Sequence, residues 1–408
     1  MCVLDTRKRK MISHFVFIIT ILLGSAVFIS ISPVLGVLEY LQSITSTGVI
    51  LYPTDNPTLR TEGVRIVDSS GNDFVPFGIN TFCTAFPASW TTDRPPEQPI
   101  PSLLDKLKTL KVNLVRITIS KQLWDTETGY KEHIDKWVSG LAEREIRSFL
   151  DFNFPWYIGS GRTLSERFEW FYEAMTTSSR KQEVFGLYDE WIDRYGSNKW
   201  MVGIGLMNEP MGFPPDYSFP ITSDELNTAW RNFVIEAVQH ISSQNSDLII
   251  FVNGGGVNWG TDLRPFMGKV PVTGNVVYTF HHYPEYVLRD GEDYPFTDNY
   301  VVDYQNGDFT AGYNHMKEYV SAMGLNILND NVPVLVEEFG FGGEGFYSNW
   351  EQTCDDFYKL CNTEGRHVGI IEWALTLANG PFGVFENDWS TLSQHGQKWA
   401  ENLNLYAI

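Results

Sequence analysis

The 408-residue sequence predicts an α/β fold, a (β/α)8 barrel with extended βα loops, on three observations. Short apolar runs alternate with amphipathic stretches over about 350 residues, as strands and helices alternate in such TIM barrels. No internal linker, repeat or low-complexity segment interrupts this alternation. A doubly wound sheet is the alternative, but no phosphate-binding loop follows the first run. The runs number eight and lie at 75–80, 112–118, 147–153, 201–208, 248–253, 275–281, 332–338 and 368–373.

The N-terminus carries a predicted targeting segment. Four basic residues at 7–10 precede an uncharged apolar stretch at 15–37, which is long enough to span about 30 Å of hydrocarbon. We therefore expect residues 1–37 to form an uncleaved signal anchor or, alternatively, a cleaved signal peptide. The basic cluster should stay in the cytoplasm, so the rest of the chain is predicted to be extracellular or on the cell surface.

A linker and a hairpin are predicted ahead of the barrel. Residues 38–61 are rich in Ser, Thr and Pro and are expected to form a short linker. Residues 62–408 are expected to form one domain. Its first element is a β-hairpin at 64–75, which turns at Ser70-Gly71-Asn72.

Helices are predicted where apolar residues recur at helical spacing. This pattern is clear at 131–144 and at 224–239, and Ser223 is the expected N-cap of the second helix. Cys354 and Cys361 are seven positions apart, so on one helix they would lie roughly 10 Å from each other. That separation is beyond disulfide reach, and we expect free, mostly buried thiols.

Composition excludes several classes of function. The chain carries 50 acidic and 30 basic residues, and a surface this negative repels nucleic acid. Aromatic residues make up 14 % of the chain, which excludes extensive disorder. The stretch 285–308 holds seven acidic residues without the spacing of an EF-hand, so we expect a solvated loop, with calcium binding as the alternative.

Acidic residues close two of the predicted strands. Glu209 follows the fourth run, whereas Glu337 and Glu338 end the seventh. Residues at the C-terminal ends of barrel strands carry the chemistry in this fold. Two carboxyl groups placed there suit glycoside cleavage, which needs one protonated acid and one ionised carboxylate. Strand alternation puts Glu337 and Glu338 on opposite faces but does not tell which face is the interior.

The succession VRI, LMNEP, FHHY, VLVEEFG and EWAL resembles glycoside hydrolase family 5, the cellulase-type barrels. The resemblance covers roughly residues 62–400, in the family's order and spacing. It implies that Glu209 is the acid/base and that Glu338 is the nucleophile, with Glu337 turned away. It also implies that Asn208 lies beside the sugar 2-hydroxyl.

The same resemblance implies further substrate-binding residues at strand ends. Arg116 would hydrogen-bond Glu338 and hold it ionised. Tyr283 would also bond Glu338, while His281 would contact the substrate or the acid/base. Trp373 would stack on a sugar ring.

The third run departs from the family pattern. Many members have Asp-x-His there, but this chain has Asp151-Phe152-Asn153. Asn153 can bond a sugar but cannot take up a proton near neutral pH, so the pH profile is expected to shift. No metal site is expected, because the adjacent His281 and His282 should point to opposite faces of their strand.

The sequence thus predicts an exported, retaining endo-β-1,4-glucanase (cellulase) that cleaves a polysaccharide by double displacement. We expect a monomer that needs no cofactor and meets the membrane only through its N-terminal segment. Among enzymes the alternative is an endo-β-mannanase or another β-glycanase on the same barrel. Outside enzymes the alternatives are a surface glycan-binding protein and a structural cell-envelope protein.

Overall fold

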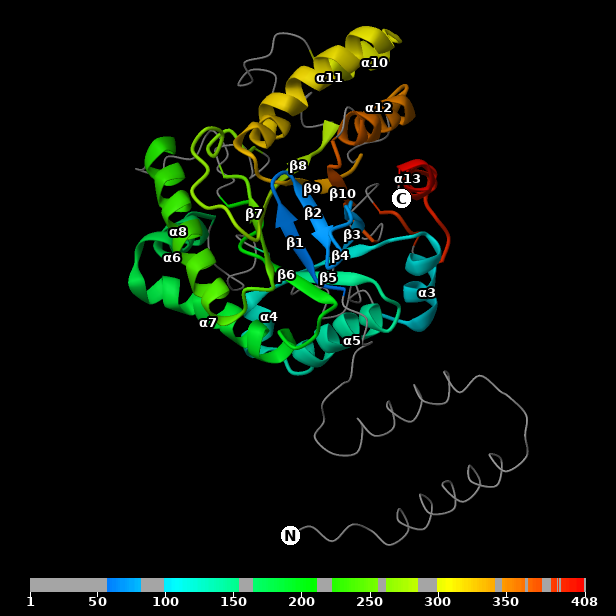
Figure 1. Cartoon of the computed structure of the whole chain (residues 1–408). Coiled ribbons are helices and arrows are strands. Elements are labelled where there is room, and N and C mark those ends of the chain that lie inside the picture. Colours follow the sequence, from blue (N-terminus) through cyan, green and yellow to red (C-terminus); the bar gives the residue numbers. More distant parts are fainter. Residues whose placement is uncertain are drawn as a thin grey trace, which may run out of the picture. The chain divides into compact units, whose positions relative to one another are not determined.

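Short strands and helices alternate along the chain in the computed structural model (Figure 1). The predicted targeting segment 1–37 and most of the predicted linker lie outside the described residues. None of the described helices has the length and apolar character that crossing a bilayer requires. The described residues are 57–81, 99–153, 164–210, 222–255, 262–284, 299–341, 347–363, 366–375, 383–386, 388 and 390–406.

Eight parallel strands form a closed barrel in sequential order, because β10 pairs with both β9 and β3. Each of the eight predicted apolar runs overlaps one of these strands, with boundaries that agree within three residues, so the predicted fold is confirmed. The strands are β3 Phe77–Thr81, β4 Leu114–Ile119, β5 Arg147–Phe152, β6 Met201–Gly205, β7 Ile249–Asn253, β8 Val276–His282, β9 Val334–Phe339 and β10 Gly369–Glu372.

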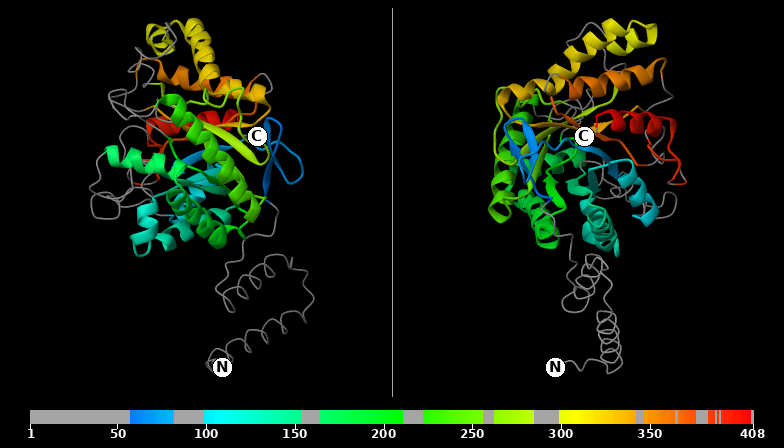
Figure 2. Two further views of the ribbon diagram at one scale, coloured as in Figure 1. Left: turned by 90° about the vertical axis from the view of Figure 1, so that its left-hand side faces the viewer. Right: turned by 45° about the vertical axis from the view of Figure 1, so that its right-hand side comes forward.

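Helices surround the strands in every view (Figures 1 and 2). The predicted helices at 131–144 and 224–239 correspond to α5 and α8. The described helical elements are α3 Pro101–Thr109, α4 Lys121–Thr126, α5 Tyr130–Ala142, α6 Leu164–Thr176, α7 Ser178–Tyr195, α8 Ser223–Gln244, α10 Tyr300–Asn306, α11 Phe309–Met323, the 3-10 helix η2 Leu325–Asp330, α12 Trp350–Asn362 and α13 Gln394–Tyr406.

The start of α8 differs from the prediction by one residue. Thr222, not Ser223, is the N-cap, and its hydroxyl accepts a hydrogen bond from the backbone N–H of Glu225. The carboxylate of Glu225 in turn accepts from the backbone N–H of Thr222 at 2.9 Å. This reciprocal capping box satisfies two backbone donors, which explains why the helix begins where it does.

Two apolar layers hold the barrel together. The larger layer lies between the strands and the helices and includes Cys354 and Cys361 on α12, which are both buried and free, as predicted. The smaller layer fills the barrel interior, where Phe149 stacks on Phe251 with ring centroids 4.0 Å apart. Gly203 faces these rings, and a Cβ at this position would collide with Phe251 and with the neighbouring backbone.

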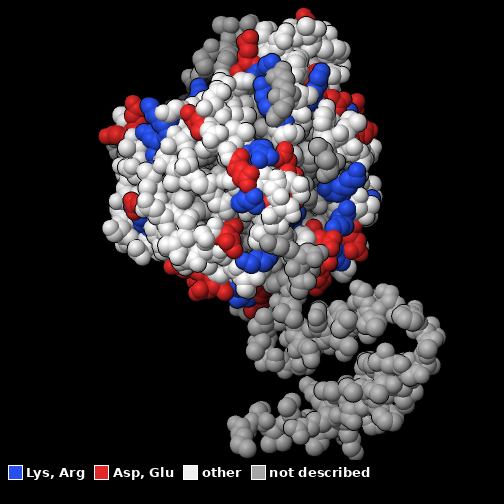
Figure 3. Space-filling model, in the orientation of Figure 1, with Lys and Arg blue, Asp and Glu red and all other residues white. Residues whose placement is uncertain are grey.

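A β-hairpin, β1 Leu59–Glu62 and β2 Arg65–Asp68, lies against the N-terminal end of the barrel. Leu59 and Ile66 join the interior apolar layer, and the backbone N–H of Thr61 donates to Asn275 Oδ1 just before β8. The N-terminal end of the barrel is therefore covered, which leaves the C-terminal ends of the strands for chemistry. Over the hairpin, near the centre of the face in Figure 3, acidic and basic side chains are intermixed.

The hairpin begins earlier than predicted. Its turn is at Gly63-Val64 rather than at Ser70-Gly71-Asn72, so residues 59–61 belong to a strand and not to the linker. The chain also turns at Ser70-Gly71-Asn72, but residues 73–75 do not form the second strand of a hairpin there. They pair with β2 only through an isolated bridge between Val67 and Asp73. The first strand has only one buried apolar side chain, Leu59, which is too weak a pattern to reveal it in the sequence.

The acidic stretch 285–308 is only partly described. Residues 285–298 lie outside the described residues, and the prediction of a loop is wrong for α10. Tyr300 and Tyr304, one helical turn apart, are buried, and this apolar pair favours a helix despite the acidic neighbours.

Candidate active site

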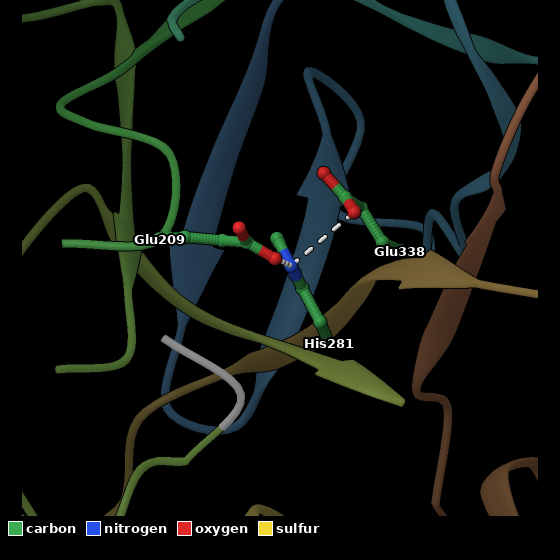
Figure 4. Close-up of side chains that lie close together, drawn as sticks. All are labelled: Glu209, His281 and Glu338. Carbon is green, nitrogen blue, oxygen red and sulfur yellow. Dashed lines mark hydrogen bonds and ion pairs between the residues drawn. The ribbon is translucent and has the colours of Figure 1, made fainter. Parts of the chain in front are cut away.

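Three side chains meet at the C-terminal end of the barrel (Figure 4). Nδ1 of His281, on β8, lies 3.0 Å from Oε1 of Glu209 and 3.3 Å from Oε2 of Glu338. One carboxylate oxygen of each glutamate and this nitrogen all lie within 4.8 Å of one another. This spacing is close to the carboxyl separation of about 5–5.5 Å in retaining glycosidases, and shorter than the roughly 6.5–9.5 Å of inverting ones.

Glu209 follows β6 and has an unusual backbone. Its φ is 45°, in the left-handed region, which costs roughly 1–2 kcal/mol for a residue other than glycine. Burial raises the pKa of Glu209 above its ordinary value, although the hydrogen bond with His281 acts in the opposite direction. A carboxyl group with a raised pKa keeps its proton long enough to serve as an acid.

Glu338, on β9, is held by donors on both carboxylate oxygens. Arg116 Nη1 donates to Oε1 at 2.5 Å, and the hydroxyl of Tyr283 donates to Oε2 at 2.5 Å. The contacts expected of Arg116 and Tyr283 are therefore present. Together these bonds fix the orientation of the carboxylate toward Glu209 and His281.

Arg116 is the central cation of the site. It lies in the middle of β4, is fully buried, and also bonds Asn80 Oδ1 at 2.9 Å, Asp151 Oδ2 at 2.7 Å and Asn208 Oδ1. Burial alone lowers the pKa of the guanidinium, but the carboxylates around it raise it above its ordinary value. A buried charge persists only with such partners.

Asn208 and Asn153 continue this network at the ends of β6 and β5. Asn208 Nδ2 donates to Asn153 Oδ1 at 3.4 Å, and both side chains are buried. Asn153 thus takes part in the site, although it replaces the expected histidine. Burial raises the pKa of the neighbouring Asp151 to about 7, although Arg116 acts in the opposite direction.

Trp373 directly follows β10 at the same end of the barrel. It is 8 % exposed, and its backbone N–H donates to the carbonyl of Phe339 at 2.8 Å. The peptide bond between Trp373 and Ala374 is cis. The hydrogen bond from Trp373 to Phe339 holds the end of the eighth strand against the seventh, next to Glu338.

His281 and His282 point to opposite faces of β8, as predicted. His282 stacks on Phe357 with ring centroids 4.6 Å apart, and its Nε2 lies 3.0 Å from the hydroxyl of Tyr300. Burial lowers the pKa of His282 to about 3, so this ring is neutral. The two histidines are therefore not placed to bind one metal ion. Glu209, His281 and Glu338 present three donor atoms to one point, but these atoms already contact one another.

Glu337 is not turned away from the site, and the prediction is wrong on this point. Its side chain is 1 % exposed and lies inside the barrel, where Oε2 accepts hydrogen bonds from Asn253 Nδ2 at 2.7 Å and from Thr279 Oγ1 at 2.6 Å. Oε1 lies 3.4 Å from Nε of Arg116. Both glutamates of the seventh strand therefore belong to one buried cluster.

An irregularity in β9 explains this arrangement. Leu335 faces the barrel interior, so regular alternation also turns Glu337 inward and Glu338 outward. The pairing with β8, however, shifts after Val336, and His281 then pairs with Glu338. The extra residue lets two consecutive side chains reach the interior.

No role was predicted from the sequence for four further polar residues of the cluster, although one of them, Asp151, is the acidic residue of the altered Asp-x-His pattern. They are inward-facing, fully or almost fully buried, and hydrogen-bonded. Two of them had a readable signal, because an asparagine closes the first and the fifth apolar run. The four residues are Asn80, Asp151, Asn253 and Thr279.

A closed (β/α)8 barrel with two facing glutamates at its C-terminal end defines a glycoside hydrolase. Residues 67–379 match the cellulase family, glycosyl hydrolase family 5, and the chain therefore belongs to this family. The resemblance noted in the sequence is thus confirmed.

Curated relatives and solved structures are consistent with this assignment. An endoglucanase of Paenibacillus polymyxa is 26 % identical over 378 residues, which cover 83 % of this chain and 85 % of that protein. Endoglucanase A of Butyrivibrio fibrisolvens is 22 % identical over 364 residues, 86 % of this chain and 67 % of that protein. The structure of the beta-glucanase SdGluc5_26A from Saccharophagus degradans superposes with a TM-score of 0.65 at 18 % identity, over 88 % of this chain and 98 % of that one.

Proposed function

We propose that this chain is a retaining endo-β-1,4-glucanase in which Glu338 is the nucleophile and Glu209 is the acid/base. One observation carries the proposal: the two carboxyl groups face each other across Nδ1 of His281, with oxygens within 4.8 Å. The names of the two curated relatives, both endoglucanases, support β-1,4-glucan as the substrate class.

In the first step, Glu338 attacks the anomeric carbon while Glu209 gives its proton to the leaving oxygen. The glycosidic bond breaks, and an ester bond forms between the sugar and Glu338. Arg116 and Tyr283 orient the attacking carboxylate through their bonds to its two oxygens. The raised pKa of Glu209 keeps the proton available for this step.

In the second step, Glu209 is ionised and takes a proton from water, and the oxygen of that water attacks the anomeric carbon. The ester bond to Glu338 breaks, and two inversions give net retention. His281 supports this exchange, because its Nδ1 lies close enough to contact Glu209 and Glu338 in turn.

Asn208, Asn153 and Trp373 are proposed to bind the sugar in the cleavage subsite. Asn208 is held by Arg116 and bonded to Asn153, so its amide is oriented before substrate arrives. A fixed amide beside the 2-hydroxyl gives hydrogen bonds that strengthen as the transition state forms. The ring of Trp373 supplies an apolar face for the pyranose.

Export is part of the proposal. Residues 1–37 combine a basic cluster with an apolar stretch of membrane-spanning length, and a glucan polymer is a substrate met outside the cell. We propose that the barrel acts outside the cell or at its surface, either tethered or released. Fractionation of cells that produce the full chain, with an antibody against the barrel, tests this placement.

The substrate is tested with the purified full chain on carboxymethylcellulose, mixed-linkage β-glucan and β-mannan. We expect the viscosity of carboxymethylcellulose to fall early, before much reducing sugar appears, because internal bonds are cut. The variant Glu209→Gln is the matched control and should release little sugar. Hydrolysis of mannan without hydrolysis of either glucan would refute the substrate assignment, and binding without turnover would refute the enzymatic one.

A further inference from the structure

The two-carboxylate reaction leaves one buried carboxylate without a role. Glu337 neither faces Glu209 nor serves the two steps above, yet it lies inside the barrel with its side chain 1 % exposed. Burying a charge is costly, and such a group persists only where other groups compensate it. Its neighbours therefore indicate what the charge does.

Glu337 lies on the side of the His281 ring that is opposite Glu209. Nε2 of His281 is 3.7 Å from Glu337 Oε2, while Nδ1, on the other side of the ring, contacts Glu209 at 3.0 Å. Asn253 Nδ2 lies 2.7 Å from Glu337 Oε2 and 3.0 Å from His281 Nε2, so this amide joins the two groups. The imidazole thus lies between two carboxylates, with Nδ1 at Glu209 and Nε2 near Glu337.

The contacts of Glu337 keep it ionised. Burial alone raises its pKa, but Arg116, together with the nearby His281 ring and the hydrogen bond from Thr279, lowers it to about 2. Oε2 accepts two hydrogen bonds, and a carboxylate that accepts several bonds holds its charge. Glu337 is therefore a fixed negative charge over the working pH range.

Carboxyl groups outnumber cations around His281. In the described part of the chain, the charged or titratable groups of the cluster around His281 come from five strands or strand ends. They are Arg116 on β4, Asp151 on β5, Glu209 after β6, Tyr283 after β8, and Glu337 and Glu338 on β9.

This excess of negative charge favours a proton on His281. Burial alone lowers the pKa of the ring, but Glu338, Glu209 and Glu337 raise it to about 10. The amide nitrogen of Asn253 only donates, and its contact with Nε2 favours the form whose proton is on Nδ1. Nδ1 carries a proton in the cationic ring and in this neutral form alike, and that proton is the one that faces Glu209.

We propose that Glu337 is a positioning residue that keeps Nδ1 of His281 protonated and directed at Glu209. The inference rests on the proposed function for its catalytic consequence, because a donor at Nδ1 stabilises Glu209 when it becomes ionised between the two steps. Glu337 contacts no reacting atom and acts through the groups that it touches, which are His281, Asn253 and Arg116.

Removing the negative charge of Glu337 should lower the pKa values of both His281 and Glu209. Without a negative neighbour, His281 and Glu209 both lose their protons at a lower pH. Since Glu209 must be protonated to cleave, the alkaline limb of kcat/KM should move to lower pH in Glu337→Gln. A Coulomb interaction over these distances at an effective dielectric constant of about 20 predicts a shift of roughly one pH unit or more.

The test follows the His281 ring by NMR in the full chain and needs no substrate. His281→Asn assigns the signal, and the pH is varied from 6 to 11.5. We expect Glu337→Gln to lower the titration midpoint of His281 and to shift the pH profile of kcat/KM in the same direction. Thr279→Val removes one hydrogen bond to Glu337 and should shift the midpoint less.

Glu372→Gln is the matched control. Glu372 is also a fully buried glutamate, but it pairs with His395 at 3.1 Å and with Tyr358 at 2.6 Å on the outer side of the barrel. Its loss removes the same charge from the protein, and it should leave the His281 midpoint where it is. If Glu337→Gln folds and leaves the midpoint unchanged, the proposal is wrong.

The remaining outcomes are also decisive. If Glu337→Gln does not fold, Glu337→Asp, which keeps the charge but withdraws it from Nε2 of His281, gives the answer alone, and an unchanged His281 midpoint in that variant overturns the proposal. If the wild-type chain cleaves no glucan, the proposed function fails, while the NMR titration still tests the effect of Glu337 on the ring.

Discussion

The hydroxyl of Tyr283 lies 2.5 Å from Oε2 of Glu338, so this phenol donates a hydrogen bond to the proposed nucleophile. The other oxygen of Glu338 is bonded to Arg116 at the same distance. One donor is neutral and the other is charged, which allows their contributions to be separated. Tyr283 influences the direction of attack, whereas Arg116 also balances the charge of the whole cluster.

Replacing Tyr283 by Phe should slow the first step without unfolding the protein. A hydrogen bond to a charged group is worth about 1.5–3 kcal/mol, which corresponds to a fall in kcat of roughly 10- to 100-fold. Steady-state kinetics on an aryl β-cellobioside measure the effect. Tyr358→Phe is the control, because it removes a similar phenol–carboxylate bond, to Glu372 at 2.6 Å, outside the site. Equal losses of kcat in both variants would contradict a specific role for Tyr283.

Replacing Arg116 by Met should strongly destabilise the fold. The change leaves Asp151, Glu337 and Glu338 buried without their shared cation, and breaking such a cluster costs about 3–5 kcal/mol. Guanidinium unfolding curves give the loss in the free energy of unfolding. Arg194→Met, which breaks an exposed pair with Asp135, should cost less than about 1 kcal/mol. A loss of similar size in both variants would show that the buried carboxylates do not depend on Arg116.

Replacing Glu338 by Gly should stop the first step while leaving the acid in place. Azide can then occupy the vacated space and attack the same face of the sugar, which gives an α-glycosyl azide. The product is identified by NMR after incubation with an activated aryl β-cellobioside. Formation of the β-azide would mean that the two glutamates have been assigned the wrong roles.

Replacing Glu209 by Ala should leave the first step in place for an activated substrate and slow the second step. An activated aryl glycoside needs little protonation, so the glycosyl-enzyme still forms, but its hydrolysis loses the base. Azide should restore turnover by attacking the intermediate from the opposite side, which gives the β-glycosyl azide. No rescue by azide, with burst kinetics absent, would argue against Glu209 as the acid/base.

Acid should destabilise the protein partly through Glu337. Its pKa is about 2 in the fold against an ordinary value of 4.5, so the unfolded chain binds the proton more tightly. The stabilisation is complete above about pH 4.5 and is lost as the pH falls toward 2, with a size on the order of 3 kcal/mol. Unfolding free energies of the wild type and of Glu337→Gln at several pH values test this. We expect a shallower acid slope in the variant, and parallel slopes would contradict the prediction.

The barrel was predictable because each strand is a short apolar run with a clear boundary. The facing pair of Glu209 and Glu338 could also be predicted, because the C-terminal ends of parallel strands meet at one end of a barrel. The residues that compensate Arg116 were harder to find. Asn80 looks like an ordinary polar position, and Asp151 belongs to an incomplete Asp-x-His pattern, and only the closed barrel brings both to Arg116.

That Glu337 and Glu338 both face the barrel interior could not be read from the sequence. Alternation along a strand assigns neighbouring residues to opposite faces, and a register shift in pairing breaks that rule without a sequence signal. The β1 strand was missed for a related reason, because its stability comes from Leu59 packing under the barrel and from Asn275, far along the chain.

The covered N-terminal end of the barrel has a practical consequence for immobilising the enzyme. The described chain begins at Pro57, whose carbonyl accepts a hydrogen bond from Arg147 at the start of β5. Anything joined ahead of this residue, such as a display scaffold or a solid support, attaches at the pole opposite the two glutamates. The catalytic mouth then faces the surrounding medium, where an insoluble polymer chain has room to approach it.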